Sequence, residues 1–397
     1  MRWWALLLVG LGAALPSRAS AQEDPGARLQ VFLMTMGPGA MVYERFGHNA
    51  IWVRDTVSGA DAVYNYGTFD FAQPGFIGRF VMGRPQYWLG VSDLATTLRT
   101  YDFYGRRVEV QELDLPPAVR AELALALAEN ARPEQREYRY DYFLDNCSTR
   151  VRDILDRVLG GALRRATVGV PGEGTLRFHT QRSVSNDPAM YLGILAAMGP
   201  RVDAPLDQWG EMFLPEKVQE RVRELRVRWP DGREVPLVRT EATLLDLNRY
   251  TVEPTRPNWT LPLAGIGAAI AGAILLTLVG GAVGTLGRLA ATLWLVASAV
   301  GGLVLAFLWL GTDHVFTRSN ATLLLLAPTG LALIPAIWRG GGRRMAVAHL
   351  AVVALGAVAV LAGWQSSGEL IALALPAGAA AAWVAGRGRT RDERSAI

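Results

Sequence analysis

The sequence predicts an exported α+β domain followed by an all-α bundle of about five transmembrane helices. Three observations lead to this fold class. An apolar run with a signal-peptidase pattern opens the chain, mixed polar and apolar segments fill residues 22–258, and long apolar runs follow Asn258. The 397 residues are 51% hydrophobic and only 19% charged. This composition excludes a disordered polymer and argues against an ordinary soluble enzyme, while the length suits two or three structural units.

The first 21 residues have the features of a signal peptide. Arg2 supplies a positive start, residues 3–15 form an apolar run, and residues 19–21 (Ala-Ser-Ala) supply the small-x-small pattern that signal peptidase reads. We therefore expect cleavage before Gln22 and export of residues 22–258. An uncleaved signal anchor is the alternative, and it exports the same domain.

Residues 22–258 alternate between strand and helix patterns. Apolar, β-branched and aromatic residues predict strands at 29–36, 48–54, 62–67 and 106–115, and the turn-rich segment 55–61 joins the second and third strands as a hairpin. Pro116 and Pro117 end the fourth strand and start a helix that reaches residue 131. An aromatic segment at 138–144 leads into an amphipathic helix over 148–160. An Asp-Gly turn predicts a small hairpin over 226–238.

Five apolar runs after Asn258 approach the roughly 20 residues that a membrane-spanning helix needs. They cover 261–283, 289–310, 321–338, 345–362 and 370–385. If residues 22–258 lie outside, then Arg288, the basic loop 339–344 and the basic tail 387–394 all fall on the cytoplasmic side, as the positive-inside rule requires. We therefore expect a domain at 22–258 in the periplasm and a transmembrane domain at 259–397 in a bacterial inner membrane.

The charges divide in the same way. Residues 22–258 carry 29 basic and 32 acidic side chains, whereas the chain from Trp259 onward carries nine arginines and four acids. The basic pI near 9.4 therefore comes from the membrane half. A basic face for nucleic acid is not present in the exported domain, and we expect no nucleic-acid partner.

The single cysteine, Cys147, excludes intrachain disulfides and a cysteine-rich zinc site, and we expect neither a metal nor a cofactor. It lies at the predicted N-terminus of the 148–160 helix, where free N–H groups and the helix dipole favour a thiolate. Arg150 and Arg152, within the first turns, are expected to add to this effect. A buried structural cysteine is the alternative. The neighbours Asp-Asn before it and Ser-Thr after it are polar, which favours a nucleophile.

A nucleophilic thiol needs a base, and the chain has four histidines. His349 lies in the fourth apolar run and is interpreted as a helix-packing residue. His179 lies in a polar stretch and is interpreted as a solvated surface residue. His48 opens a strand directly after Gly47. A histidine on a strand that faces a cysteine at a helix start is the geometry of papain-like thiol enzymes, so we expect His48 to be the base.

A third residue is expected to orient the imidazole of His48. A hairpin register that pairs even with odd positions can place Asn65 opposite Trp52, on the face that carries His48. A slip of one residue would place one of the flanking tyrosines there instead. Asn146, beside the nucleophile, is a rival for the same role.

Several of these segments together resemble one known family. Residues 46–50 (Phe-Gly-His-Asn-Ala), 64–70 (Tyr-Asn-Tyr-Gly-Thr-Phe-Asp) and 140–150, which ends in Leu-Asp-Asn-Cys-Ser-Thr-Arg, resemble the periplasmic domain of bacterial lipoprotein N-acyltransferases of the Lnb type. The resemblance continues through 210–215 and the 226–238 hairpin. It reaches the membrane half, where His314, Asn320 and the Leu-rich run after them match the family's outward loop, and so it covers nearly the whole mature chain.

The resemblance implies a fold and a reaction. The Lnb periplasmic domain is similar to circularly permuted papain-like folds, a group that also holds lecithin:retinol acyltransferase and NlpC/P60 enzymes. Cys147 would attack an ester of a phospholipid acyl donor and become a thioester, and the amine of a diacylglyceryl-cysteine apolipoprotein, the acceptor, would take the acyl chain. His48 would deprotonate the thiol and then the amine, and the Ser148 amide would stabilise the oxyanion.

Further polar residues are candidates for substrate binding. Asn146 and Ser148 flank the nucleophile. Asp313, His314 and Asn320 lie in the short outward loop between the second and third spans, where three polar residues at a membrane surface either bind a headgroup or peptide or are merely solvated.

Two other functions compete with acyl transfer. A membrane-tethered NlpC/P60-like thiol hydrolase, such as a peptidoglycan endopeptidase or lipid amidase, would use the same pair of residues with water as the acceptor, but it needs one anchor rather than five spans. A non-catalytic membrane binding protein would leave Cys147 inert. Residues 162–225 are either a lid or an accessory helical layer.

Overall fold

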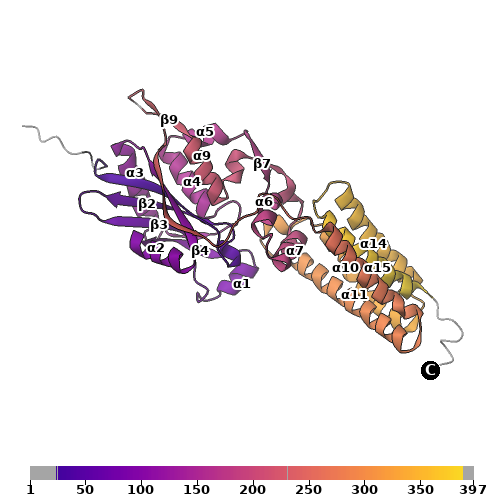
Figure 1. Cartoon of the computed structure of the whole chain (residues 1–397). Helices are drawn as coiled ribbons and strands as arrows, with labels where there is room; N and C mark the ends of the chain where they lie inside the picture. The colour runs from indigo at the N-terminus through magenta and orange to yellow at the C-terminus, as the bar shows by residue number, and fades with distance from the viewer. Residues whose placement is uncertain (1–23, 25, 230, 388–397) are drawn as a thin grey trace, which may run out of the picture.

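A seven-stranded antiparallel sheet forms the centre of the N-terminal half in the computed structural model, which describes residues 24, 26–229 and 231–387 (Figure 1). The strand order is β11-β5-β1-β2-β3-β4-β6. The strands are β1 (Leu29–Met36), β2 (His48–Asp55), β3 (Asp61–Thr68), β4 (Gln86–Ser92), β5 (Arg106–Leu113), β6 (Glu137–Arg139) and β11 (Val238–Asn248). The predicted signal peptide, residues 1–21, and most of the predicted basic tail lie outside the described residues.

The predicted β2–β3 hairpin is confirmed, but the expected register is wrong in one detail. Trp52 pairs with Val63 rather than with Asn65, although even positions do face odd ones. The turn decides this register. The Asp55 carboxylate accepts the N–H groups of residues 57 and 58, and the turn then closes with Arg54 opposite Asp61.

Several strands were missed by the sequence analysis, and β4 and β11 are the longest of them. β4 follows a short helix, α1 (Phe76–Val81), and carries a glycine in its middle, which weakens a strand pattern. β11 is an edge strand whose pairing with β5 shifts register at three places, so that its side chains do not alternate regularly. The predicted small hairpin is present as β9 (Arg226–Arg228) and β10 (Glu234–Pro236).

Both faces of the sheet are covered by helices. On one face, Val31 and Leu33 belong to the main core, which includes α3 (Pro117–Asn130), α4 (Cys147–Val158) and α9 (Pro215–Glu224). On the other face, Met34 and Met36 form a second cluster with α2 (Leu94–Phe103). Burying each such side chain contributes roughly 1.5–3 kcal/mol. The sheet is thus a rigid support, and α4 packs directly on β2 and β3.

Residues 162–225 form a layer of short elements between the sheet and the membrane half (Figure 1). Its contacts reach both sides. The Asn320 amide donates to the carbonyls of Ala196 and Ala197, and the Tyr191 hydroxyl bonds to the Glu369 carboxylate at 3.1 Å. The segment is therefore an accessory layer that joins the two halves. Its elements are α5 (Ala162–Thr167), β7 (Pro171–Thr175), α6 (Leu176–Ser183), α7 (Pro188–Ala197), β8 (Pro205–Asp207), α8 (Gln208–Glu211) and α9.

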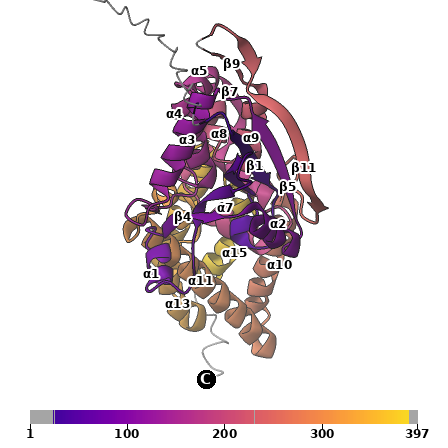
Figure 2. The ribbon, with the colours of Figure 1, turned by 90° about the vertical axis from the view of Figure 1, so that its left-hand side faces the viewer.

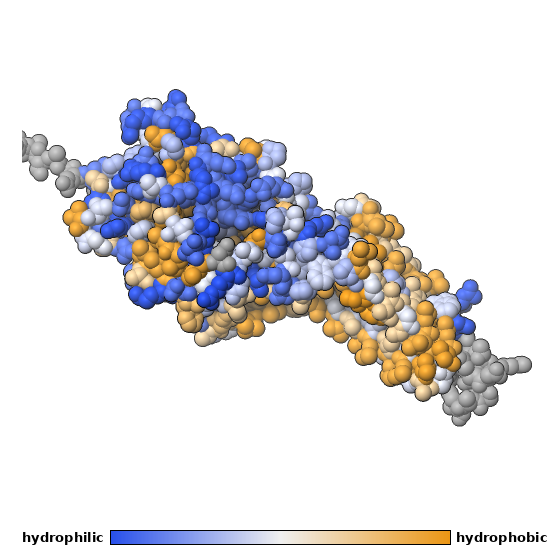
Figure 3. All heavy atoms as spheres, viewed as in Figure 1, coloured by the Kyte–Doolittle hydropathy of each residue, from blue (hydrophilic) through white to orange (hydrophobic). Residues whose placement is uncertain are grey.

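Up to residue 387, where the described part of the chain ends, the C-terminal half contains five helical segments that are long and apolar enough to span a membrane, which confirms the predicted bundle. Figure 2 shows the ribbon from a second side. Figure 3 shows that the surface of these segments is largely apolar. They run over Thr260–Leu278 (with α10, Thr260–Leu275), Gly281–Leu310 (α11), Thr322–Arg339 (with α12, Thr322–Leu325, and α13, Ile334–Arg339), Arg343–Leu361 (α14) and Gly368–Gly386 (α15).

Two details of these spans differ from expectation. The turn between the first two spans lies at residues 279–280, where Gly280 has a φ of +81°, so Arg288 lies inside α11 and not in a connecting turn. The third span is not one continuous α-helix. Pro328 begins a 3₁₀ segment between α12 and α13, because proline cannot donate the backbone hydrogen bond that an α-helix needs.

Candidate active site

Cys147 is the first residue of α4, as predicted, and its neighbours fix the start of that helix. The Asn146 side chain accepts the N–H groups of Ser148 and Thr149, both at 2.9 Å. The Thr149 hydroxyl accepts the Asn146 N–H in return, at 2.8 Å, which completes a capping box. Such a cap stabilises a helix by about 1 kcal/mol. The thiol is therefore held at the positive end of the helix dipole.

His48 begins β2, and its imidazole is oriented by Asn65 on the adjacent strand. His48 Nε2 lies 3.3 Å from Asn65 Oδ1. The other end of the Asn65 amide donates to the Val63 carbonyl at 3.2 Å, which fixes the oxygen toward the imidazole. Asn65 thus lies on the His48 face, as expected, although it is not opposite Trp52.

The surroundings of Cys147 shift its acidity in two directions. Burial raises the pKa of the thiol, because it disfavours the charged form. The positive charge of His48, a hydrogen bond to its imidazole and a further one from the Asn49 N–H outweigh burial, and the Ser148 hydroxyl, 3.8 Å from the sulfur, adds a smaller effect. The pKa of Cys147 falls to about 7. Close to half of the thiol is ionised at neutral pH.

Gly67 makes room for the thiol. Its φ is +87°, and a side-chain Cβ at this position would lie 3.4 Å from both the Cys147 Cβ and the Tyr140 ring. Any other residue would strain the backbone at this φ, and its Cβ would be in contact with that of Cys147. The glycine in the Tyr-Asn-Tyr-Gly segment was visible in the sequence, but its place beside Cys147 was not.

Tyr138 is a site residue that the sequence analysis missed. Its side chain is 7% exposed, and its hydroxyl is buried with no hydrogen-bond partner in the part of the chain that the structure describes. Burial, and then the negative charge of Cys147, raise the pKa of Tyr138 well above 10, so the phenol keeps its proton. The Arg150 guanidinium lies 3.7 Å above the ring. The only signal was the alternating aromatic pattern at 138–144.

The two arginines of α4 have other partners than the thiol. Arg150 forms two hydrogen bonds with Asp145, at 2.6 and 2.7 Å. Arg152 bonds to Asp153 and to the carbonyl of Trp209. Neither arginine therefore forms a hydrogen bond with the thiol. The residues that lower the pKa of the thiol most are His48 and the adjacent Asn49.

The Ser148 amide does not have the role that we expected. Its N–H already donates to the Asn146 side chain, so it is not free for an oxyanion. The N–H of Cys147 has no acceptor among the described residues, since its helical partner position lies before the helix begins. The Asn146 amide nitrogen donates to the carbonyls of Tyr142 and Phe213, at 2.8 and 2.9 Å. Asn146 therefore positions α4 and does not point a free polar atom at a substrate.

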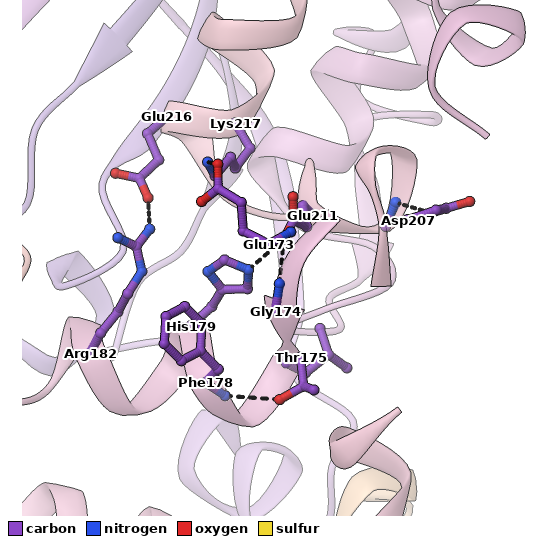
Figure 4. A network of polar contacts seen from close by, with 12 residues as sticks. Glu173, Gly174, Thr175, Phe178, His179, Arg182, Asp207, Glu211, Glu216 and Lys217 are labelled. Carbon is purple, nitrogen blue, oxygen red and sulfur yellow. Dashed lines mark hydrogen bonds and ion pairs between the residues drawn. The ribbon is translucent and has the colours of Figure 1, made fainter. Parts of the chain in front are cut away.

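His179 is not a solvated surface residue, and that interpretation is wrong. Its side chain is fully buried, and Nε2 lies 2.9 Å from Glu211 Oε1 (Figure 4). The Glu211 carboxylate also accepts the N–H groups of Glu173 and Gly174. The polar stretch around His179 is helix α6, which packs inward and meets its partners from a distant segment. His349 is buried and bonded to Thr329, as expected of a packing residue.

The outward-loop candidates contact the N-terminal half and are not gathered at Cys147. Asp313 pairs with Arg84 at 2.7 Å and Arg139 at 3.3 Å, and its N–H donates to the Met82 carbonyl at 2.9 Å. The Asn320 side chain is 1% exposed, its amide nitrogen donates to α7 as described above, and its oxygen accepts from the Thr322 N–H and the Gln365 side chain. His314 lies against Gly83.

The described residues, 24, 26–229 and 231–387, contain no group of three or more His, Cys, Asp or Glu side chains placed to hold a metal ion.

Comparison with known protein families assigns both halves of the chain. Residues 18–185 match the Lnb N-terminal periplasmic domain, and residues 256–375 match the Lnb transmembrane domain. No curated protein and no solved structure matches the chain, so the circularly permuted papain-like arrangement stays a prediction. The two matches cover most of the sequence, and the five apolar segments agree with them. The chain is therefore a membrane protein with a periplasmic N-terminal domain, and it belongs to the Lnb family of lipoprotein N-acyltransferases.

Proposed function

We propose that this protein moves an acyl chain from a glycerophospholipid to the N-terminal amine of diacylglyceryl-cysteine lipoproteins, through a thioester on Cys147. The observation that carries the proposal is the Cys147 thiol, whose pKa falls to about 7 beside an imidazole that Asn65 orients. An ionised thiol at neutral pH is the form that attacks a carbonyl.

In the first step, the Cys147 sulfur attacks the ester carbonyl carbon of the phospholipid. With its Nε2–H directed to Asn65, His48 has Nδ1 available to take the thiol proton. The C–S bond forms, and the ester C–O bond then breaks. The imidazolium returns its proton to the leaving oxygen, which departs as the hydroxyl of a lysophospholipid.

Two donors are suited to the oxyanion of this step. The Cys147 N–H has no acceptor among the described residues, and the Tyr138 hydroxyl is buried without one. A Cβ on Gly67 would lie 3.8 Å from the Tyr138 hydroxyl and 3.4 Å from the Cys147 Cβ, so the hydroxyl is near the thiol-bearing residue. A pre-organised donor without a partner in the resting state loses nothing when it binds the developing charge. The raised pKa of Tyr138 keeps the hydroxyl a donor.

In the second step, the lipoprotein amine attacks the thioester carbonyl. His48 takes the amine proton, an amide C–N bond forms, the C–S bond breaks, and the thiolate is restored. The five membrane spans support this reaction over hydrolysis of a soluble substrate, because donor and acceptor are both lipids that stay in the bilayer.

Intact-mass analysis of the full chain in phospholipid nanodiscs tests the proposal. Incubation with a deuterated phospholipid should add one acyl mass to Cys147, and neutral hydroxylamine should remove it. A diacylglyceryl-cysteine lipopeptide should then discharge the enzyme and gain the acyl group as an amide. A lipopeptide with an acetylated amine is the matched control and should leave the adduct in place.

Two outcomes would contradict the proposal. One is that the protein forms no adduct although Cys147 reacts with a small alkylating reagent. The other is that the adduct decays to free fatty acid at the same rate with free and acetylated lipopeptide, which would identify a hydrolase. The Cys147→Ala variant sets the background in both cases.

A further inference from the structure

Six large apolar side chains are exposed next to the active site, on the face of the periplasmic domain nearest the membrane half. We call them the apolar platform. Ile77 is 62% exposed, Leu144 60% and Phe71 56%. The other members are Phe80, Val81 and Tyr142. Clustered exposed apolar side chains of this size mark a surface that meets a membrane or a partner.

The members of the platform come from two segments that touch each other. Helix α1 carries Ile77, Phe80 and Val81, and the Phe80 ring meets the Tyr142 ring edge to face at 6.2 Å. Phe71 packs edge to face on the Phe76 ring at 5.3 Å. The second segment, 142–144, directly precedes Asp145, Asn146 and the nucleophile.

The platform lies beside the outward end of α11. Helix α11 ends at Leu310, and three residues later the Asp313 N–H donates to the carbonyl of Met82, which caps the end of α1. Phe143, inside the second segment, meets the Phe316 ring of the same outward loop at 4.9 Å. Since α1 is only about 9 Å long, all of it lies close to the level at which α11 leaves the bilayer.

Figures 1 and 2 agree with this placement, since both draw α1 at the edge of the periplasmic domain beside the membrane helices. The space-filling view in Figure 3 shows apolar atoms along the lower edge of this domain, on the side toward the membrane half.

Aromatic rings connect the platform with the nucleophile. Tyr142 meets the Tyr140 ring at 6.0 Å, and Tyr140 stacks on Tyr87 at 4.3 Å. A Cβ on Gly67 would lie 3.4 Å from the Tyr140 ring and 3.4 Å from the Cys147 Cβ, so this ring is close to the thiol-bearing residue. The series of rings is thus aromatic from the platform to the neighbourhood of Cys147.

We propose that the apolar platform inserts into the periplasmic leaflet of the membrane, among phospholipid acyl chains, and that the rings behind it guide the donor ester to Cys147. The insertion of the platform into the membrane is inferred from the exposure and position of its side chains alone. The guidance of the donor ester to Cys147 rests on the proposed function. An amphipathic segment at the interface, with its apolar side chains below the headgroups, is a stable arrangement that needs no further partner.

Lipid-quenching fluorescence tests the insertion without any catalysis. In a full-length Cys147→Ser background, Ile77→Cys or Phe80→Cys is labelled with an environment-sensitive dye and reconstituted into phosphatidylethanolamine and phosphatidylglycerol vesicles. Lipids with a nitroxide on the acyl chain should remove more than half of the fluorescence at both positions. The matched control is Leu125→Cys, which is 72% exposed on α3, away from the membrane half, and should not be quenched.

Labels at residues 77 and 80 that respond to the quencher no more than the label at 125 would overturn the insertion. A second measurement tests the guidance. In the native background, Ile77→Glu with Phe80→Glu should slow thioester formation from vesicle lipid about tenfold and leave the alkylation rate of Cys147 by a small soluble reagent unchanged. Leu125→Glu is the control.

An unchanged rate of thioester formation in the double variant would overturn the guidance. If the wild-type protein forms no thioester, the proposed function fails, while the quenching result still decides whether the platform enters the membrane.

Discussion

At the scale of single residues, burial and His48 act on the Cys147 thiol in opposite directions, and His48 prevails. The balance depends on one imidazole, since the two nearby arginines of α4 are paired elsewhere. His48 in turn depends on Asn65 for its orientation. The reactivity of the thiol is therefore a property of these three side chains together.

The pH dependence of alkylation should follow this balance. Because the thiolate is the reactive form, the rate with iodoacetamide should rise with pH and reach half of its plateau near pH 7. In His48→Ala the two largest lowering influences are lost, while burial and the smaller influences of Asn49 and Ser148 remain, so the midpoint should rise to the value of about 8.5 for a free cysteine or above it. Cys147 is the only cysteine, so Cys147→Ala gives the blank. An unmoved midpoint in His48→Ala would show that another group sets the pKa.

Tyr138→Phe should separate activity from stability. Loss of an oxyanion donor lowers the rate of thioester formation by about 10²-fold or more. The melting temperature should stay the same or rise, because the buried hydroxyl has no partner to lose. Tyr87→Phe, in the same ring stack, is the control and should change neither. A drop in stability with full activity would assign the hydroxyl a structural role.

At the scale of elements, the segment 211–215 contacts both α4, which carries Cys147, and β2, which carries His48. The Phe213 carbonyl accepts from Asn146, at the start of α4, and the Pro215 carbonyl accepts from Asn49, next to His48. Glu211 ties this segment to β7 and α6 (Figure 4). A buried carboxylate thus supports the two elements that carry the proposed catalytic residues, α4 and β2, through this segment.

Glu211→Ala should destabilise the domain by about 3 kcal/mol or more, because it leaves His179 and two backbone N–H groups buried without their acceptor. Glu216→Ala is the matched control. It removes a half-exposed ion pair with Arg182 and should cost no more than about 1 kcal/mol. Urea unfolding of the full chain in detergent, followed by tryptophan fluorescence, measures both. Equal losses of unfolding free energy in the two variants would contradict the inference that Glu211 supports α4 and β2.

Acid should weaken the same contact. Burial raises the pKa of Glu211, but the hydrogen bond from His179 and those from Glu173 and Gly174 outweigh it and lower the pKa below its usual value. A carboxyl whose folded pKa is lowered contributes stability above its unfolded pKa and loses it as the pH falls through the folded pKa. Part of the acid lability of the wild type should therefore be absent from Glu211→Gln, as melting curves between neutral and acidic pH will measure.

The sequence predicted local features of these elements and missed the contacts between distant segments. Strand β1, the β2–β3 hairpin and the start of α4 follow from alternation, turn residues and capping, all of which act over a few residues. The burial of His179 depends on Glu211, 32 residues away, and its polar neighbours suggested the opposite. Edge strand β11 has bulges that disrupt its pattern. Packing decided each of these cases.

At the scale of the whole molecule, Asp313 is one of several side chains that join the periplasmic domain to the membrane half. Asp313 pairs with Arg84 and Arg139, and Arg84 is 229 residues away in sequence, beyond the reach of any local pattern. The sequence identified Asp313 as a candidate for substrate binding. In the structure Asp313 contacts Arg84 and Arg139, and its N–H donates to the carbonyl of Met82, so the outward loop is joined to the end of α1 and to the end of β6.

Asp313→Asn should affect the position of the Cys147 thiol relative to the bilayer without changing the reactivity of the thiol. These partly exposed ion pairs contribute no more than about 1 kcal/mol each to stability, so the fold should survive. The alkylation rate of Cys147 should stay unchanged, whereas thioester formation from vesicle lipid should slow, because the thiol is no longer held at the bilayer surface. Asp231→Asn breaks a comparable pair with Arg233 in the β9–β10 hairpin and serves as the control. Equal rates in the two variants would exclude a positioning role.

The docked outward loop also has a consequence for the choice of acceptor. Because the loop holds the thiol at one height above the bilayer, the proposed reaction accepts only an amine that is itself kept at that height. In a diacylglyceryl-cysteine the amine and the lipid anchor belong to the same residue, so every such chain presents its amine equally, whatever sequence follows. We therefore expect tolerance toward the protein part of the acceptor and strict discrimination by the spacing between amine and anchor.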